Sequence, residues 1–295
     1  TLLKPEATNA DVVALCAEAA ELGTFSVCVS PTFVSLAVAN VTNGVKVATV
    51  CGFPSGKHEA EIKAAEAKLS VLQGAHEVDM VIDVGRAIMG DWDYLEAEVS
   101  AVRKATSGAL LKVILETAAL TDEQIAKACQ RCESAGADFV KTATGFHPAG
   151  GADVRAIKIM HETVGGKLGI KASGGIRIIE FATELINAGA TRLGLSSSRA
   201  ILDAATARGI PYYRLTSGSL VQLGEGCEYR RIWTAETDAL WEAIKNDQQW
   251  PLVEPSASPS MSPVASVTTV APKPADISLS VLNATTTVGL AKTAA

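Results

Sequence analysis

The chain has 295 residues, of which 48% are apolar and 20% are charged, a composition typical of a globular protein that excludes an intrinsically disordered chain. Its 26 basic and 32 acidic residues give a formal net charge of −6, and no run of Lys or Arg supplies the basic face that binding to nucleic-acid phosphates requires. No stretch approaches the ~18 consecutive apolar residues of a membrane span, and the chain does not open with a signal-peptide pattern. We therefore expect a cytoplasmic protein with no nucleic-acid or membrane partner.

The first part of the chain repeats one unit, a short β-branched run followed by a polar or glycine-rich turn and an amphipathic stretch of about 10 to 16 residues. This alternation predicts β-strands joined by helices. The predicted strands cover residues 25–29, 45–50, 77–82, 111–115, 139–141, 168–171 and 192–195. The predicted helices cover residues 9–22, 59–73, 92–105, 122–135 and 180–188, several of them beginning at a capping-type residue, namely Asn9, Asp91 or Thr121.

The predicted strands are too apolar to have one face in water, which indicates a parallel sheet covered by helices. An open doubly wound sheet and a closed eight-stranded barrel both fit this pattern, and periodicity alone does not decide between them. The G-x-G-x-x-G fingerprint of an open dinucleotide-binding sheet is absent. A barrel needs an eighth strand, and Thr1-Leu2-Leu3 has the character of the C-terminal end of one. We therefore predict an α/β fold, a (β/α)8 TIM barrel whose first strand is largely missing from the chain.

Composition divides the chain into three parts. The βα alternation ends near Gly209, so residues 1–208 are expected to form the barrel domain. Residues 209–250 contain three of the four tryptophans and a helical stretch at 237–246, which predicts a partly ordered appendage. Six of the eleven prolines lie within residues 251–274 and no aromatic residue follows Trp250, so residues 251–295 are predicted to form a flexible tail.

The six cysteines lie in apolar or helical contexts, which favours reduced, buried thiols over disulfides in a cytoplasmic chain of this size. Cys129 and Cys132 form a single C-x-x-C pair in a helical stretch, with no second pair and no histidine nearby in the sequence. A zinc site needs more ligands than this pair supplies. We predict no bound metal and no cofactor.

Charged residues end three of the predicted strands, where a barrel presents its reactive groups: Asp79, Lys141 and Lys171. A single lysine there commonly reaches out to water, but two that end consecutive strands are expected to project into the same mouth. A nucleophilic lysine needs its pKa lowered by roughly three units from about 10.4. A second ammonium group at ~5 Å supplies about 3.3 kcal/mol at an effective dielectric constant of ~20. The pair therefore predicts a Schiff-base lysine, with Asp79 placed to relay protons.

Small residues follow the last two predicted strands. Ser173-Gly174-Gly175 precedes a helix beginning near Ile178, and the run from Gly194 to Ser198 opens the last helix. Such turns expose backbone N–H groups at helix N-termini, and phosphate sites of barrels usually lie after strands 7 and 8. Two such turns on adjacent strands predict a phosphate site.

The first 205 residues resemble the short-form deoxyribose-phosphate aldolases. The shared motifs are TLLKP at 1–5, VCVSP at 27–31, GFPSG at 52–56, EVDMV at 77–81, KVILET at 112–117, FVKTATGF at 139–146, KASGGIR at 171–177 and RLGLSS at 192–197. The resemblance implies a class I aldolase that cleaves 2-deoxy-D-ribose 5-phosphate reversibly to D-glyceraldehyde 3-phosphate and acetaldehyde without a metal.

The same resemblance implies a role for individual residues. Lys141 would form the imine, Lys171 would lower its pKa, and Asp79 would act with Lys171 and water as the proton relay. The substrate pocket would include Cys28, Thr142 and Thr144. The phosphate would be held by Gly145, Gly174, Gly175, Gly194, Ser196 and Ser197, with Arg177 nearby.

Two alternatives stay open at this stage. One is another lysine-imine barrel enzyme acting on a different phosphorylated carbonyl compound, and the other is a non-catalytic sugar-phosphate-binding remnant. In each case the expected partner is a small phosphorylated sugar or a related compound. A second copy of the chain, in a homodimer, is a further expected partner.

Overall fold

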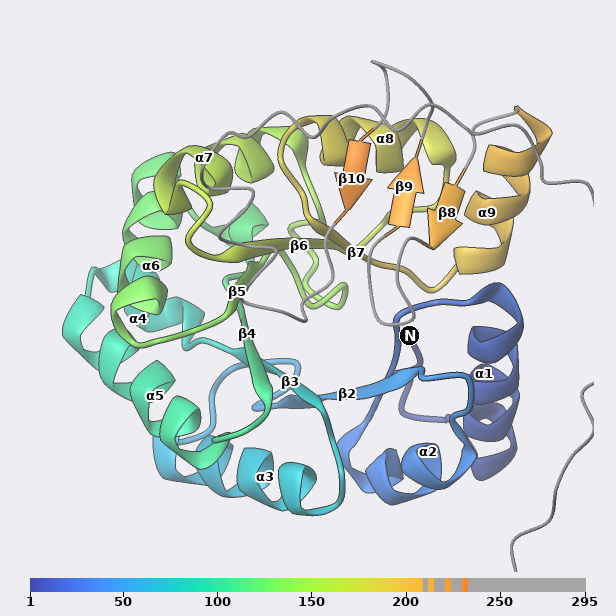
Figure 1. Cartoon of the computed structure of the whole chain (residues 1–295). Helices are drawn as coiled ribbons and strands as arrows, with labels where there is room; N and C mark the ends of the chain where they lie inside the picture. The colour runs from blue at the N-terminus through green and yellow to red at the C-terminus, as the bar shows by residue number, and fades with distance from the viewer. Residues whose placement is uncertain (209–211, 215–220, 224–229, 233–295) are drawn as a thin grey trace, which may run out of the picture. The chain divides into compact units, whose positions relative to one another are not determined.

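The computed structural model describes residues 1–208, 212–214, 221–223 and 230–232, and residues 1–208 contain a sheet of seven parallel strands (Figure 1). The strands are β1 (Ser26–Val29), β2 (Lys46–Cys51), β3 (Glu77–Val81), β4 (Leu110–Ile114), β5 (Phe139–Lys141), β6 (Gly169–Ser173) and β7 (Arg192–Gly194). They pair in chain order, each with the next. All seven strands predicted from the sequence are present, with ends that differ by up to two residues.

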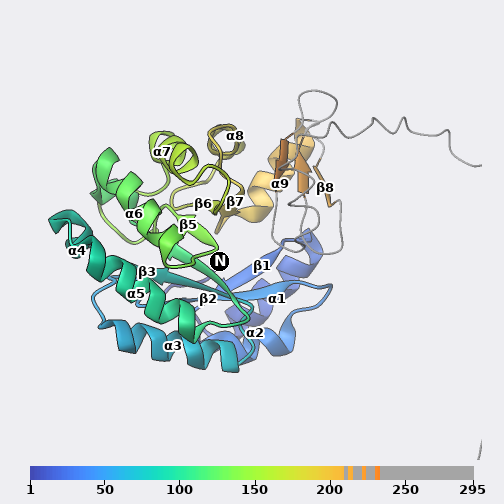
Figure 2. The same ribbon diagram turned by 60° about the vertical axis from the view of Figure 1, so that its left-hand side comes forward.

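Helices surround the outer face of the curled sheet, as the two views in Figures 1 and 2 show. They are α1 (Asn9–Leu22), α2 (Val34–Asn40), α3 (Ala60–Leu72), α4 (Val84–Met89), α5 (Trp92–Ala105), α6 (Asp122–Ser134), α7 (Val154–Val164), α8 (Ile179–Asn187) and α9 (Ser198–Ala207), with 3-10 turns η1 (Pro31–Phe33) and η2 (Thr117–Ala119). The five predicted helices are confirmed, whereas α2, α4 and α7 were not predicted.

Side-chain caps fix where several helices begin. Asp91 and Thr121 cap α5 and α6 as predicted, but the cap of α1 is Thr8 and not Asn9. The Thr8 hydroxyl accepts from the backbone N–H of Asp11, whose carboxylate in turn accepts from the N–H of Thr8. This reciprocal capping box places Asn9 inside the first turn.

The first residues of the chain lie between the two ends of the sheet. Leu2 pairs in parallel with Val29, and its N–H donates to the carbonyl oxygen of Cys28 at 2.8 Å. The amino group of Thr1 donates to the carbonyl oxygen of Leu195, just after β7, at 3.2 Å. Thr1 and Leu2 therefore lie between β1 and β7, where the eighth strand of a barrel would lie.

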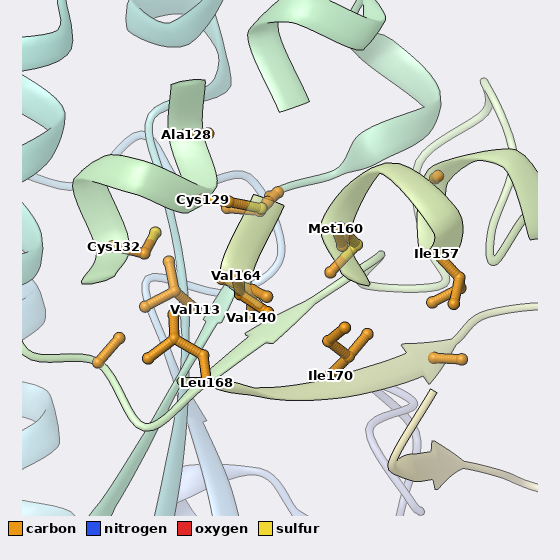
Figure 3. Close-up of a cluster of buried hydrophobic side chains, with 14 of the residues drawn as sticks. Val113, Ala128, Cys129, Cys132, Val140, Ile157, Met160, Val164, Leu168 and Ile170 are labelled. Carbon is orange, nitrogen blue, oxygen red and sulfur yellow. The ribbon is translucent and has the colours of Figure 1, made fainter. Parts of the chain in front are cut away.

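The outer layer of the core lies between the sheet and the helices. Figure 3 shows Val113, Val140 and Ile170 of neighbouring strands beneath Cys129 and Met160 of α6 and α7, and all five side chains are fully buried. The five cysteines in the described residues are unpaired and buried. Burial raises the pKa of Cys129 to about 12, so this thiol stays protonated. Both cysteines of the C-x-x-C pair, Cys129 and Cys132, are part of this apolar core.

Three further strands are described after residue 208: β8 (Tyr212–Arg214), β9 (Val221–Leu223) and β10 (Arg230–Ile232), which form an antiparallel sheet in the order β10-β9-β8. The predicted helix at 237–246 and the predicted tail at 251–295 lie outside the described residues. Within the part that the structure describes, no helix is long and apolar enough to cross a membrane.

We expect Gly169→Ala to destabilise the barrel, because a Cβ at this position would stand 2.2 Å from a ring carbon of Phe139 on the neighbouring strand. Overpacking of this kind typically lowers stability by about 1 to 3 kcal/mol. Urea denaturation measures the change. Gly85→Ala is the matched control: its Cβ would meet only the tip of Lys57 and the carboxylate of Asp83, and alanine favours the helix α4, so stability should not fall.

Candidate active site

The three charged residues singled out from the sequence lie at one level inside the sheet. Lys141 is the last residue of β5 and is paired in register with Lys171 of β6. The prediction that all three residues end their strands is wrong, because Asp79 and Lys171 are each the third of five residues in β3 and β6. The strands of a curled sheet are staggered, so residues at different positions along their strands reach the same height.

The carboxylate of Asp79 is shared by three lysines. Its Oδ2 accepts from Lys141 Nζ and from Lys171 Nζ, both at 2.8 Å. Its Oδ1 accepts from Lys112 Nζ of β4 at 2.7 Å. Asp79 and Lys112 are fully buried, and Lys141 and Lys171 are 3% and 5% exposed. The structure therefore brings together the predicted trio and adds a third lysine.

The contacts continue from Lys112 toward the other end of the strands. Lys112 Nζ also donates to Glu77 at 2.7 Å, and the other oxygen of Glu77 accepts from Arg192 Nη1 at 2.5 Å. The guanidinium of Arg192 lies over the rings of Phe25 and Phe139, with its central carbon 4.4 and 4.7 Å from their centroids. Two carboxylates and four cations thus form one buried row.

Sequence reasoning missed Lys112, Glu77 and Arg192, although a signal for two of them is present. Glu77 and Asp79 are two residues apart in a strand, so their side chains share one face. Val78 and Met80 between and beside them belong to the apolar layer under the helices. Two carboxylates on the inward face require buried cations, and Lys112 is paired in register with Asp79.

The two central lysines have pKa values shifted in opposite directions. Burial lowers the pKa of Lys141, Asp79 opposes this, and the charge of Lys171 lowers it further. Burial also acts to lower the pKa of Lys171, but the negative charge of Asp79 and its hydrogen bond outweigh it and raise the pKa of Lys171 above its usual value. The prediction that Lys171 supplies most of the shift at Lys141 is wrong, because burial is the larger cause. Burial and the Lys171 charge therefore act against the ammonium form of Lys141, whereas Asp79 favours the ammonium form of Lys171.

The three predicted pocket residues differ in what they contact. Cys28 is buried beside the two lysines, within the cluster that includes Ala48 and Val50. The Thr142 hydroxyl donates to the carbonyl oxygen of Ser173, which ties β5 to β6.

The Thr144 hydroxyl donates to Glu116 at 2.6 Å. Glu116 is 2% exposed and has a left-handed φ of 58°, and it was not predicted. The Glu116 carboxylate also accepts from the Thr144 N–H, so it fixes the loop that follows Lys141.

The small-residue turns lie where they were predicted. Gly145, Gly174 and Gly175 have φ values of 83°, 95° and 77°, which favour glycine. The loop after β5 packs directly on the turn after β6: the Ala152 N–H donates to the carbonyl oxygen of Gly174 at 2.9 Å, and a Cβ on Gly151 would collide with that oxygen. Arg177 and Ser196 are exposed, and Gly194 is half-buried.

Two helices begin at these turns without a side-chain cap. Ile178 and Ser197 are the N-cap residues of α8 and α9, and neither makes a capping hydrogen bond with its side chain. The first N–H groups of such helices favour an anion. Among the described residues, no group of three or more His, Cys, Asp or Glu is arranged to hold a metal ion.

A family model described as DeoC/LacD family aldolase matches residues 1–204. The chain belongs to the DeoC/LacD family of aldolases. A relative from Mycolicibacterium paratuberculosis, named deoxyribose-phosphate aldolase, is 60% identical over 207 residues, which are 69% of this chain and 92% of the relative. A second relative with this name, from Mycobacterium ulcerans, is 61% identical over 207 residues, or 69% of this chain and 91% of that protein.

Solved structures show the same family fold. A putative deoxyribose-phosphate aldolase from Coccidioides immitis superposes with a TM-score of 0.67 at 38% identity, covering 69% of this chain and 82% of that one. A tetrameric deoxyribose phosphate aldolase from Aeropyrum pernix gives a TM-score of 0.64 at 33% identity, covering 70% of this chain and 89% of that one. The solved structures therefore match the part of this chain that contains the buried row of charges.

We expect the stability of this aldolase to fall in acid partly through Glu77. Burial alone would raise the pKa of Glu77, but Lys112 and Arg192 outweigh it and lower the pKa from 4.5 to about 2. A carboxylate whose pKa is lower in the folded than in the unfolded protein stabilises the fold at pH values above its unfolded-state pKa. This stability is lost as the pH falls toward its folded-state pKa. Glu77→Gln should therefore remove about 3 kcal/mol of the pH dependence between about pH 4.5 and pH 2.

Urea denaturation at a series of pH values measures this dependence. Glu162→Gln is the control, because Glu162 is exposed on α7, and it should keep the pH dependence of the unchanged protein. The same acid dependence in the two variants would contradict the assignment to Glu77.

Proposed function

We propose that this aldolase cleaves 2-deoxy-D-ribose 5-phosphate to D-glyceraldehyde 3-phosphate and acetaldehyde, reversibly, through an imine on Lys141. Relatives that are about 60% identical over nine tenths of their length carry the name of this activity. The observation that carries the proposal is the pair of buried lysines on one carboxylate, with the pKa of Lys141 lowered and that of Lys171 raised. Such a pair supplies a nucleophile and an acid at the same pH.

The reaction begins with the neutral amine of Lys141, which attacks the aldehyde carbon of the open-chain sugar. The carbinolamine loses its hydroxyl as water, and the ammonium of Lys171 is placed to supply the proton. The resulting iminium at C1 accepts the electron pair of the bond between C2 and C3. At the same time the C3 hydroxyl loses its proton, and C3 leaves as the aldehyde carbon of D-glyceraldehyde 3-phosphate. An enamine of two carbons stays on Lys141, is protonated at carbon, and is hydrolysed to acetaldehyde.

Asp79 is proposed to return the protons that these steps release. Its Oδ2 touches the nitrogen atoms of both Lys141 and Lys171 at 2.8 Å, so a proton moves between them, directly or through water, over one carboxylate. Cys28 would line the pocket beside these amines. Thr142 and Thr144 would shape the pocket through the hydrogen bonds that they make with Ser173 and Glu116.

The phosphate is proposed to bind at the turns that open α8 and α9. Their uncapped N-termini offer backbone N–H groups, and the glycine conformations let the backbone approach an anion closely. The proposed residues are Gly145, Gly174, Gly175, Arg177, Gly194, Ser196 and Ser197. A homodimer and a cytoplasmic location stay predictions, which size-exclusion chromatography and cell fractionation test.

We expect acetaldehyde and cyanoborohydride to add one ethyl group to Lys141, because only a neutral amine attacks the aldehyde near pH 7. Peptide mass mapping identifies the modified lysine. Lys141→Arg should abolish both the labelling at this site and the cleavage activity, since arginine does not form the imine.

Release of acetaldehyde from deoxyribose 5-phosphate separates the proposed activity from imine chemistry on another phosphorylated substrate. Preferential labelling of Lys171 would overturn the assignment of the nucleophile. A chain that binds the sugar phosphate but traps no aldehyde would be a binding protein and not an enzyme.

Ser196→Asp should raise KM for deoxyribose 5-phosphate about tenfold or more, because it places a carboxylate where the phosphate is proposed to bind. The kcat/KM for unphosphorylated deoxyribose should change little. Steady-state kinetics on both sugars measure the difference. Ser107→Asp adds the same charge at an exposed turn before β4 and should leave both values unchanged, whereas equal loss on both sugars in Ser196→Asp would argue against this phosphate site.

A further inference from the structure

The buried row of charges is unbalanced. Arg192, Lys112, Lys141 and Lys171 are four cations, and Glu77 and Asp79 are the two carboxylates that they contact. When all six groups are ionised, the row has a net charge of +2. Since buried charge of one sign is unfavourable, the row is stabilised if one of its lysines gives up a proton.

Lys112 holds a special place in this row because it touches both carboxylates. Its Nζ lies 2.7 Å from Glu77 and 2.7 Å from Asp79, and its side chain is fully buried. It contacts the carboxylate oxygen of Asp79 that the other two lysines leave free. Lys112 thus fixes Asp79 from one side while Lys141 and Lys171 bind the other side.

We propose that Lys112 is a positioning residue that orients Asp79 and, by its charge, keeps Lys141 in the uncharged form that attacks the substrate. The inference rests on the proposed role of Lys141 as the nucleophile. Lys112 does not touch the reacting atoms in this account; it acts through Asp79 and through the electrostatic potential at Lys141.

The distances set the size of the effect. Lys112 and Lys141 each lie within 2.8 Å of one of the two oxygens of the same carboxylate, which places their nitrogen atoms within about 8 Å of each other. At ~7 Å and an effective dielectric constant of ~20, the repulsion between two ammonium groups changes a pKa by between about one and two units. Loss of Lys112 also leaves Asp79 to attract the Lys141 ammonium more strongly, which acts in the same direction.

The remaining groups around this interior stay the same in the variants below. β1 contributes Cys28, and the amino group of Thr1 lies close enough to interact with Lys171 and Lys141. β6 and β7 contribute Lys171 and Arg192. β2 contributes Ala48 and Val50 to the interior cluster, neither of which is titratable.

The test is the rate of reductive ethylation of Lys141 by acetaldehyde and cyanoborohydride as a function of pH. Lys112→Met removes one cation, so the rise of the rate with pH should move upward by about one to two units. Glu77→Gln removes one carboxylate, so the rise should move downward. In Lys112→Met/Glu77→Gln the net charge of the row is restored, so the midpoint should return to within about half a unit of that of the unchanged protein. The kcat for sugar cleavage should stay reduced, because Lys112 no longer holds Oδ1 of Asp79.

Lys63→Met is the matched control. Lys63 is also fully buried and bonds to one carboxylate, Glu98, at 2.7 Å, but it lies between α3 and α5 on the outside of the sheet. It should lower the melting temperature, as Lys112→Met does, without moving the pH midpoint. A shift in both variants would mean that loss of stability alone perturbs Lys141.

The outcomes separate this inference from the proposed function. If the unchanged protein is not ethylated at Lys141, the proposed function fails. If it is ethylated there and Lys112→Met keeps the same midpoint, only the role of Lys112 fails. If Lys112→Met does not fold, Glu77→Gln tests the proposed charge effect on its own. A pH midpoint of Lys141 ethylation that stays the same or moves upward in Glu77→Gln would overturn the role proposed for Lys112.

Discussion

The carboxylate of Asp79 is the group on which the rest of the site depends. Three lysines inside a low-dielectric interior would repel one another and would each be costly to bury. One carboxylate that accepts a hydrogen bond from each of them makes this arrangement tolerable. Because Asp79 and Glu77 together carry two negative charges against four cations, the site holds its lysines close together with fewer carboxylates than basic groups.

The parallel sheet makes this cluster possible. Alternation along β3 sends Val78 and Met80 outward to the helices and Glu77 and Asp79 inward, so the same five residues build both the apolar layer and the charged interior. Pairing in register then places Lys112 beside Asp79 and Lys141 beside Lys171. The turns after β6 and β7 lead into α8 and α9, whose first backbone N–H groups have no side-chain cap.

Much of this was accessible from the sequence. The period of the apolar runs predicted seven parallel strands. The charged residues at the ends of predicted strands pointed to Lys141, Lys171 and Asp79, which the structure brings into contact. The sequence argument failed where the answer depended on burial: a lysine pair suggested that charge repulsion lowers the pKa of Lys141, whereas removal from water is the larger cause. The sequence argument also missed Lys112. A lysine inside an apolar run is normally expected at the edge of a strand, and its buried partners are known only once the neighbouring strands are placed. Helix α2 and helix α4 are short and lack the length over which a period is recognised.

The row of charges has a consequence for how the chain folds. Glu77 and Arg192 are separated by 115 residues, and the groups between them come from five strands, β3 to β7. Each charged side chain stays in water until its partners arrive, since burial of an unpaired charge is strongly unfavourable. Water is therefore excluded from the interior only when distant parts of the sheet come together. The buried row therefore forms together with the assembly of β3 to β7, and a sheet that lacks one of these strands lacks part of the row.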